Sequence, residues 1–284
     1  MKKEKRSFGK ILMVLTLIFF YLPIVYMVIF SFNSGKSLTS FSGFSLRWYR
    51  HMMESHTMME SLYTTFSIAL IATAISTVVG TISAIGLSKS KKIVQNLMEQ
   101  VNNLPMMNPE IVTAIGFMLL FITFRVEKGY VTMLLAHIAF CIPYVMLSVM
   151  PKIRSLDPNL ADAAMDLGAT PWRALTKVIV PQIMPGIVTG IILALGRIVG
   201  ESAALLFTAG SDYKLPKFTG AFGDNLAKLA HKAMESGGTL TIELYLQMQK
   251  GQYDNAFGIG CVLIVIVLIL NLLTKLAANK LRRE

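Results

Sequence analysis

The stretch DAAMDLGATPWRALTKVIVP, residues 162–181, constrains the architecture of this chain more than any other. It is too polar to cross a bilayer, although long apolar runs lie on both sides of it. Helix start and stop signals are nevertheless dense in and just before it. The stretch therefore predicts an ordered element in water, attached to membrane helices.

Two short helices are predicted in this region. Asp157 is expected to cap the first, with Pro158 at its first position and Gly168 just past its end. Thr170 and Pro171 give the second helix the same kind of start. Each helix has one apolar face, formed by Leu160, Ala164 and Leu167 in the first and by Trp172, Leu175 and Ile179 in the second. The apolar faces are available either to a partner protein or to lipid headgroups.

Composition places the rest of the chain in a membrane. The 284 residues are 54% hydrophobic and 15% charged, whereas soluble domains carry about 25% charged residues. The net charge of +11 does not indicate nucleic-acid binding, because most basic residues flank apolar segments and no nucleic-acid motif occurs. We therefore expect a protein surrounded by membrane lipid that binds no nucleic acid.

Six apolar stretches reach the length of about 20 residues that spans a bilayer as a helix. The first is too long for a signal peptide and lacks a small-residue cleavage site, so we expect it to be retained. The predicted spans are Ile11–Phe32, Tyr63–Leu87, Leu104–Phe124, Val131–Met150, Ile183–Ala209 and Ala256–Leu273.

Basic residues orient these spans. With the N-terminus in the cytosol, 16 of the 27 Lys and Arg residues fall in inner segments and ten in outer loops, and Arg197 falls within a span. The inner segments are shorter in total, so the density of positive charge is higher inside, as topology rules require. Both termini, and the segment 152–182 between the fourth and fifth spans, are therefore predicted to be cytosolic. Residues 210–255 form the long outer loop.

The cytosolic stretch resembles the loop signature of the inner-membrane permeases of ABC importers. The signature residues are Asp162-Ala163-Ala164, then Gly168, then an apolar ending at Pro181, with Asp162 in place of the family's first Glu. This resemblance implies an all-α, type I ABC importer permease in which residues 1–284 form one transmembrane domain of the bacterial cytoplasmic membrane. It implies that segment 152–182 is the coupling loop that docks on an ABC ATPase dimer. It further implies a second permease subunit and an extracytoplasmic solute-binding protein as partners.

Two cargo classes are indicated by different parts of the chain. Residues 1 to about 190 resemble the spermidine/putrescine importer permease, through YLPIVYMVIFSFN, FSLRWY, MMNPEIVTAIGFMLLF and AHIAFCIPYVMLSV. Residues from about 180 to 284 resemble the phosphate importer permease, through PGIVTGIILALGRIVGESAALLFTAG and GGTLTIELYLQM. The longer match favours polyamine, and phosphate is the alternative.

Three charged residues inside the spans are candidates for the substrate pathway. Glu110 suits a polyamine cation, or else serves as a helix cap or a hinge near the membrane surface. Arg197 suits an anion such as phosphate, and Glu201 lies four residues later on the same helix face. The alternative is that Arg197 and Glu201 only neutralise each other or pair with the second permease.

Small residues on the fifth span predict close helix packing. Gly186 and Gly190, and again Gly196 and Gly200, are spaced four apart and allow a neighbouring helix to approach. The neighbour is either in the same chain or in the second permease.

Catalytic and metal-binding patterns are absent from the sequence. NSGKS at 33–37 lacks the first glycine of a phosphate loop, since position 30 is Phe, so we expect ATP to bind only partner subunits. The four histidines show no metal-ligand spacing, and Cys141 and Cys261 are expected to be small buried hydrophobes. We therefore expect no metal, no cofactor and no enzymatic activity. A membrane sensor that docks an ATPase without transporting is the rival function.

Overall fold

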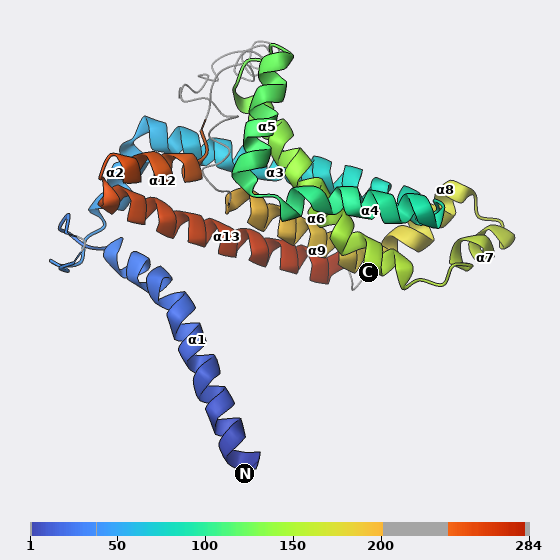
Figure 1. Cartoon of the computed structure of the whole chain (residues 1–284), viewed down its shortest axis with the longest axis horizontal. Helices are drawn as coiled ribbons and strands as arrows, with labels where there is room; N and C mark the ends of the chain where they lie inside the picture. The colour runs from blue at the N-terminus through green and yellow to red at the C-terminus, as the bar shows by residue number, and fades with distance from the viewer. Residues whose placement is uncertain (1, 38, 201–237, 282–284) are drawn as a thin grey trace.

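In a computed structural model of the chain, the described residues are 2–37, 39–200 and 238–281, and they are almost entirely helical (Figure 1). Between the helices, one isolated antiparallel bridge joins Asn33 to Phe44. The helices are α1 (Lys2–Phe30), α2 (Arg47–Glu54), α3 (His56–Ser88), α4 (Lys92–Met107), α5 (Glu110–Thr123), α6 (Tyr130–Arg154), α7 (Leu160–Asp166), α8 (Pro171–Arg173), the π-helix η1 (Ala174–Ile179), α9 (Val180–Val199), α12 (Leu240–Gln249) and α13 (Tyr253–Leu281).

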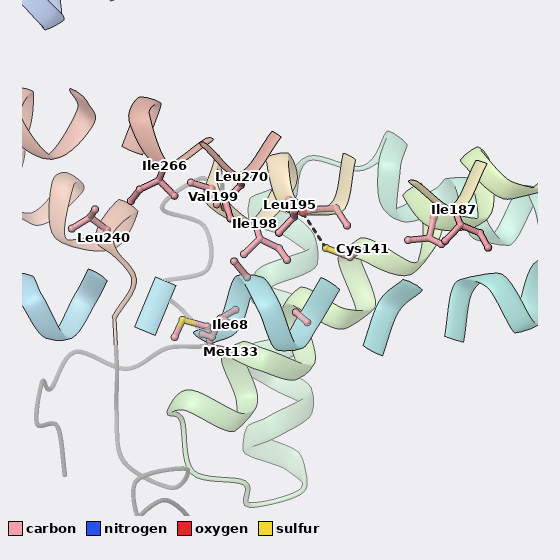
Figure 2. Close-up of a cluster of buried hydrophobic side chains, with 14 of the residues drawn as sticks. Ile68, Met133, Cys141, Ile187, Leu195, Ile198, Val199, Leu240, Ile266 and Leu270 are labelled. Carbon is pink, nitrogen blue, oxygen red and sulfur yellow. Dashed lines mark hydrogen bonds between the residues drawn. The ribbon is translucent and has the colours of Figure 1, made fainter. Parts of the chain in front are cut away.

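Helices α3, α6, α9 and α13 form the central bundle (Figure 1). Helix α3 packs on α6 and α9, and α9 also packs on α6 and α13. Their shared core is apolar, and Figure 2 shows Ile68, Met133, Cys141, Leu195 and Ile198 converging between the helices. The expectation that Cys141 and Cys261 are buried and unbridged is confirmed.

Glycines set the closest helix crossings in this bundle. Val145 of α6 lies between Gly80 of α3 and Gly190 of α9, so close that a Cβ at Gly80 would be 2.8 Å from the valine Cβ. A Cβ on Gly186 would lie 2.8 Å from the Ser148 carbonyl oxygen. Gly186 and Gly190 thus pack within this chain. No described atom, outside its own helix backbone, lies within 4 Å of a Cβ built on Gly196, so its packing role stays a prediction.

Among the described residues, five helices are long and apolar enough to cross a membrane, and a bent pair, α4 and α5, can supply a sixth span. The sequence predicted one continuous segment from Leu104 to Phe124. In the structure α4 and α5 meet at 103°, because Asn108, which precedes a proline, is extended and Pro109 has no backbone N–H with which to continue α4. The predicted third span, Leu104–Phe124, thus falls on a sharply bent helix pair.

Helices α1 and α5 project away from the bundle on opposite sides (Figure 1). None of the 18 most apolar consecutive residues of α1 is buried. On α5, only Ala114 and Phe121 are buried, while large residues such as Ile111, Val112 and Leu119 are exposed. Both helices therefore offer apolar surface that the described part of the chain does not cover.

A single long helix joins the predicted cytosolic loop to the central bundle. Helices α8, η1 and α9 are continuous from Pro171 to Val199, so Pro181, the last residue of the loop signature, does not end a helix. The turn before Pro181 is a π-helix, whose wider hydrogen-bond spacing relieves the clash between a proline ring and the preceding turn. Pro181 therefore lies inside the helix.

Candidate functional site

The cytosolic loop is a compact pair of turns at one end of the bundle (Figure 1). The first helix begins at Leu160 rather than at Pro158, and Asn159 is its N-cap. Asp157 instead accepts a hydrogen bond from the Asn159 N–H at 2.9 Å and stabilises the preceding turn. Because Asp157 forms this turn instead of capping the helix, the helix starts two residues later than predicted.

Gly168 ends this helix as predicted. Its φ of +87° lies in the left-handed region, and its N–H donates to the Met165 carbonyl at 2.9 Å. The next residue, Ala169, donates to the Ala164 carbonyl at 3.1 Å. These two bonds make a Schellman motif, in which a residue with a Cβ is strained. Asp162 and Ala163 lie exposed on the helix that the motif terminates.

The second helix starts as predicted, with the Thr170 hydroxyl accepting from the Arg173 N–H at 3.3 Å. The apolar side chains around this turn are strongly exposed. Leu167 is 91% exposed and Trp172 is 71% exposed. Behind the turn, a largely apolar cavity of about 600 Å³ separates the loop from the ends of α3, α4 and α6. Large apolar side chains that are exposed on both helices of one short loop are suited to a protein partner.

The second candidate site is an ion pair between helices that are distant in sequence. Arg197 Nη1 on α9 lies 3.1 Å from Glu110 Oε1 on α5. The arginine side chain is 14% exposed and the glutamate 42% exposed. Glu201, the partner predicted for Arg197, lies outside the described residues. The structure therefore joins two residues that the sequence had placed in rival cargo interpretations.

Aromatic residues complete this site. The Arg197 guanidinium carbon lies 5.1 Å from the centre of the Phe140 ring on α6, within cation–π range. Phe117 of α5 packs edge-on against Phe140 with 5.7 Å between ring centres, and the small buried residues Ala114 and Ala136 fill the contact. The sequence analysis missed Phe140, because an apolar span gives no signal that distinguishes one aromatic residue from its neighbours.

The site lies near the middle of the membrane-spanning bundle. Phe140 is about 15 Å along α6 from Tyr130 and about 21 Å from Arg154. A charge at this depth costs about 2.5–3.5 kcal/mol on insertion scales, and pairing with an opposite charge offsets this cost. Broken helices and helix ends at the bilayer midplane are the usual place for transporter substrate sites. The bend before Glu110 and the last turn of α9 match that pattern.

Among the described residues, no group of three or more His, Cys, Asp or Glu side chains is arranged to hold a metal ion.

A family model for the "Binding-protein-dependent transport system inner membrane component" matches residues 76–283. The chain belongs to this family. It is therefore a permease subunit of an ABC importer and a multi-pass protein of the cytoplasmic membrane. The matched residues include both the cytosolic loop and the Glu110–Arg197 pair.

Two relatives of this permease carry names that state a cargo. It is 31% identical over 207 residues to the putrescine transport system permease protein PotI of Escherichia coli K12, covering 70% of this chain and 74% of that one. It is 30% identical over 197 residues to the spermidine/putrescine transport system permease protein PotC of Haemophilus influenzae, covering 69% and 77%. The predicted resemblance to the polyamine permeases is thus confirmed.

The fold of the permease matches that of solved importers. A bacterial ABC transporter involved in the import of the acidic polysaccharide alginate superposes with a TM-score of 0.66 at 16% identity, covering 98% of both chains. At this identity the match shows the fold alone. The predicted all-α importer permease fold is therefore confirmed.

The opposite end of the permease holds a polar cavity of about 440 Å³ beside α2 and the start of α13. Its charged lining residues are Lys36, Arg47, Arg50, Glu54 and Asp254. Helix α2 is fixed there by the Trp48 ring nitrogen, which donates to the Asn33 carbonyl at 2.9 Å.

Tyr49 adds a second anchor for α2, since its hydroxyl lies 2.6 Å from the Ser31 hydroxyl. Burial raises the pKa of Tyr49 to about 12, and the nearby Cys261 thiol adds to this effect, while the Ser31 hydrogen bond acts in the opposite direction. The phenol is therefore neutral at physiological pH and available for this hydrogen bond.

Two buried acids toward this end of the bundle were also missed by the sequence analysis. Glu60 on α3 and Glu243 on α12 are both almost fully buried. Glu243 accepts from the Gln247 amide at 2.6 Å, and the exposed His56 ring lies 3.4 Å from Glu60. Their burial depends on how α12 folds back on α3, which no local pattern encodes.

Proposed function

We propose that this permease forms half of the translocation pore of an ATP-driven polyamine importer. The observation that carries the cargo assignment is its similarity to permeases named for putrescine and for spermidine/putrescine. Polyamines are linear, multiply charged cations, so the pore must not present them with an uncompensated positive charge.

The Glu110–Arg197 contact supports this cargo over phosphate. An unpaired arginine at the midplane would repel a polyamine, but here a carboxylate 3.1 Å away offsets its charge. The same carboxylate would oppose the approach of a phosphate. Phosphate, indicated by the resemblance of residues 180–284, is the competing outcome of the uptake experiment below.

Coupling to ATP hydrolysis is assigned to the cytosolic segment 152–182. Leu167 and Trp172 are the exposed apolar contacts that would enter a groove on the ATPase subunit. The continuous helix Pro171–Val199 would carry the motion of that contact into the membrane. In this scheme the ATPase dimer binds ATP, and the permease itself needs no cofactor and catalyses no reaction.

Two further partners fit the remaining surfaces. The uncovered apolar faces of α1 and α5 would contact the second permease subunit and lipid. The charged cavity beside α2 would face the extracytoplasmic solute-binding protein. Both assignments are consistent with a bundle that buries only part of its apolar surface within one chain.

Uptake by the reconstituted complex tests the cargo. Proteoliposomes that contain both permeases and the ATPase, supplied with binding protein outside and ATP inside, are expected to accumulate labelled spermidine at least about tenfold above an ATP-free control. Labelled phosphate should not accumulate. Phosphate uptake without spermidine uptake would overturn the cargo assignment, and ATPase binding with no uptake of any solute would favour the sensor function.

Replacing Gly168 by valine tests the coupling loop. A β-branched residue at a φ of +87° is strained by about 1–2 kcal/mol or more, which should unwind the Schellman motif and move Trp172. Co-purification of the ATPase and ATP-dependent uptake are both expected to fall about tenfold. Gly251→Val is the matched control, because Gly251 has a φ of +71° and open space around it at the opposite end of the bundle. Equal losses in both variants would contradict the loop assignment.

A further inference from the structure

The surroundings of Arg197 have the composition of a binding site for an organic cation. The guanidinium lies against a carboxylate, Glu110, and over an aromatic ring, Phe140. Carboxylate and aromatic faces are the groups by which proteins recognise ammonium ligands. Arg197 thus occupies this position as a cation that belongs to the protein itself.

We propose that Glu110 and Phe140 form an ammonium subsite of the pore, and that Arg197 is a tethered competitor that fills it when no cargo is bound. The inference rests on the proposed polyamine function, and it names the groups that would hold one amine of the cargo. When cargo binds, its ammonium group would replace the guanidinium on the Glu110 carboxylate.

Phe140 is fixed by its packing, whereas the Glu110 side chain is exposed. An exchange of cations on the carboxylate requires this difference. Phe140 is fixed in a small core with Phe117, Ala114 and Ala136, so the ring keeps its position. The Glu110 side chain is 42% exposed and lies in the first turn of α5, next to the bend at Pro109. The carboxylate is thus accessible to a solute while its aromatic neighbour stays in place.

Arg197 lies on a different helix from Glu110 and Phe140, and this helix is connected to the cytosolic loop. The arginine lies in the last turn of α9, at the far end of the continuous helix that begins at Pro171 in the cytosolic loop. That helix is about 40 Å long, so a displacement at the loop reaches Arg197 directly. Withdrawing Arg197 would open the subsite, and its return would expel a bound ammonium group by competition and by charge repulsion.

The Arg197 Nε atom fits this role. It is buried and hydrogen-bonds to none of the described residues, whereas an arginine with a purely structural role generally satisfies its buried donors. Within the described residues the guanidinium makes an ion pair with Glu110 and a ring contact with Phe140, and a competing cation can replace it in both.

Direct binding of labelled spermidine to the purified permease–ATPase complex, without binding protein, tests the proposal. Arg197→Gln is expected to bind spermidine at least about tenfold more tightly than the wild type, because the internal competitor is gone. Adding Glu110→Gln should abolish this gain, and adding Phe140→Leu should weaken it about fivefold. Arg125→Gln and Glu127→Gln, exposed changes of the same kind, should leave binding as in the wild type.

A charge exchange separates the subsite from a structural ion pair. In Glu110→Arg/Arg197→Glu the pair is kept but the carboxylate moves to α9, so uptake is expected to stay below a tenth of the wild-type rate. Restored uptake would overturn the inference, as would Arg197→Gln binding no tighter than the wild type. If wild-type proteoliposomes take up spermidine while Arg197→Gln shows no gain, only the subsite is wrong. If the wild type takes up no spermidine, the proposed function itself is wrong.

Discussion

Replacing Trp172 and Leu167 together by alanine is expected to detach the ATPase from this permease. Both side chains lie on the cytosolic turn, and they are 71% and 91% exposed. Buried aromatic and aliphatic anchors dominate protein interfaces, and the loss of a tryptophan alone commonly costs about 2 kcal/mol or more. The double variant should therefore weaken ATPase binding about 100-fold.

The measurement is the dissociation constant of the ATPase for permease complexes in nanodiscs, together with ATP-dependent uptake. For ATPase binding, Phe124→Ala is the matched control, because Phe124 is also 71% exposed but lies at the far end of α5, away from the loop. Neither variant should unfold the permease, since all three side chains make few internal contacts. A double variant that binds the ATPase normally would show that this face of the turn meets lipid headgroups instead.

The cytosolic loop was largely predictable from sequence because its signals are local. The Gly168 stop and the Thr170–Pro171 start depend only on backbone geometry within a few residues, and both are present in the structure. The start of the first helix was wrong by two residues, because Asp157 forms a turn with Asn159 instead of a helix cap. Local sequence patterns thus locate the two helices, but they do not show whether Asp157 caps the helix or forms a turn before it.

The ion pair in the membrane could not be predicted, because it joins residues 87 positions apart. Sequence spacing favoured Glu201 as the partner of Arg197, since residues four apart share a helix face. The contact with Glu110 depends on the bend at Pro109, which brings the start of α5 to the end of α9. The tertiary position of a broken helix therefore determines which acidic residue pairs with Arg197. The choice between polyamine and phosphate depends on that pairing.

The glycine contacts of the central bundle could be predicted from sequence only in part. The four-residue spacing indicated close packing on the fifth span, but only the structure assigns Gly186 and Gly190 to contacts within this chain. Gly80, on the other side of the same crossing, was not singled out, because only glycine pairs on the fifth span were considered, although Ser76 and Ala84 lie four positions from Gly80. The partner that fills the space, Val145, is identified only by the fold.

Gly80→Val is accordingly expected to destabilise the bundle by about 3 kcal/mol, the upper part of the usual range for overpacking. The new Cβ would lie 2.8 Å from both Cβ and Cγ1 of Val145, and Gly190 leaves that valine no room to retreat. Thermal unfolding in detergent, with the yield of monodisperse protein, measures the loss. Gly86→Val, on the same helix α3 but with no described neighbour within 4 Å, should behave as the wild type.

A double variant shows whether Val145 is the cause. Gly80→Ala and Val145→Gly are each expected to destabilise, the first by overpacking and the second by leaving a cavity. Combined, they move the side chain from α6 to α3 across the same contact, so the double variant should be more stable than the sum of the two losses predicts. Additive losses would mean that α3 and α6 can move apart at this point. The crossing would then not be the rigid contact on which a lever from the cytosolic loop to Arg197 depends.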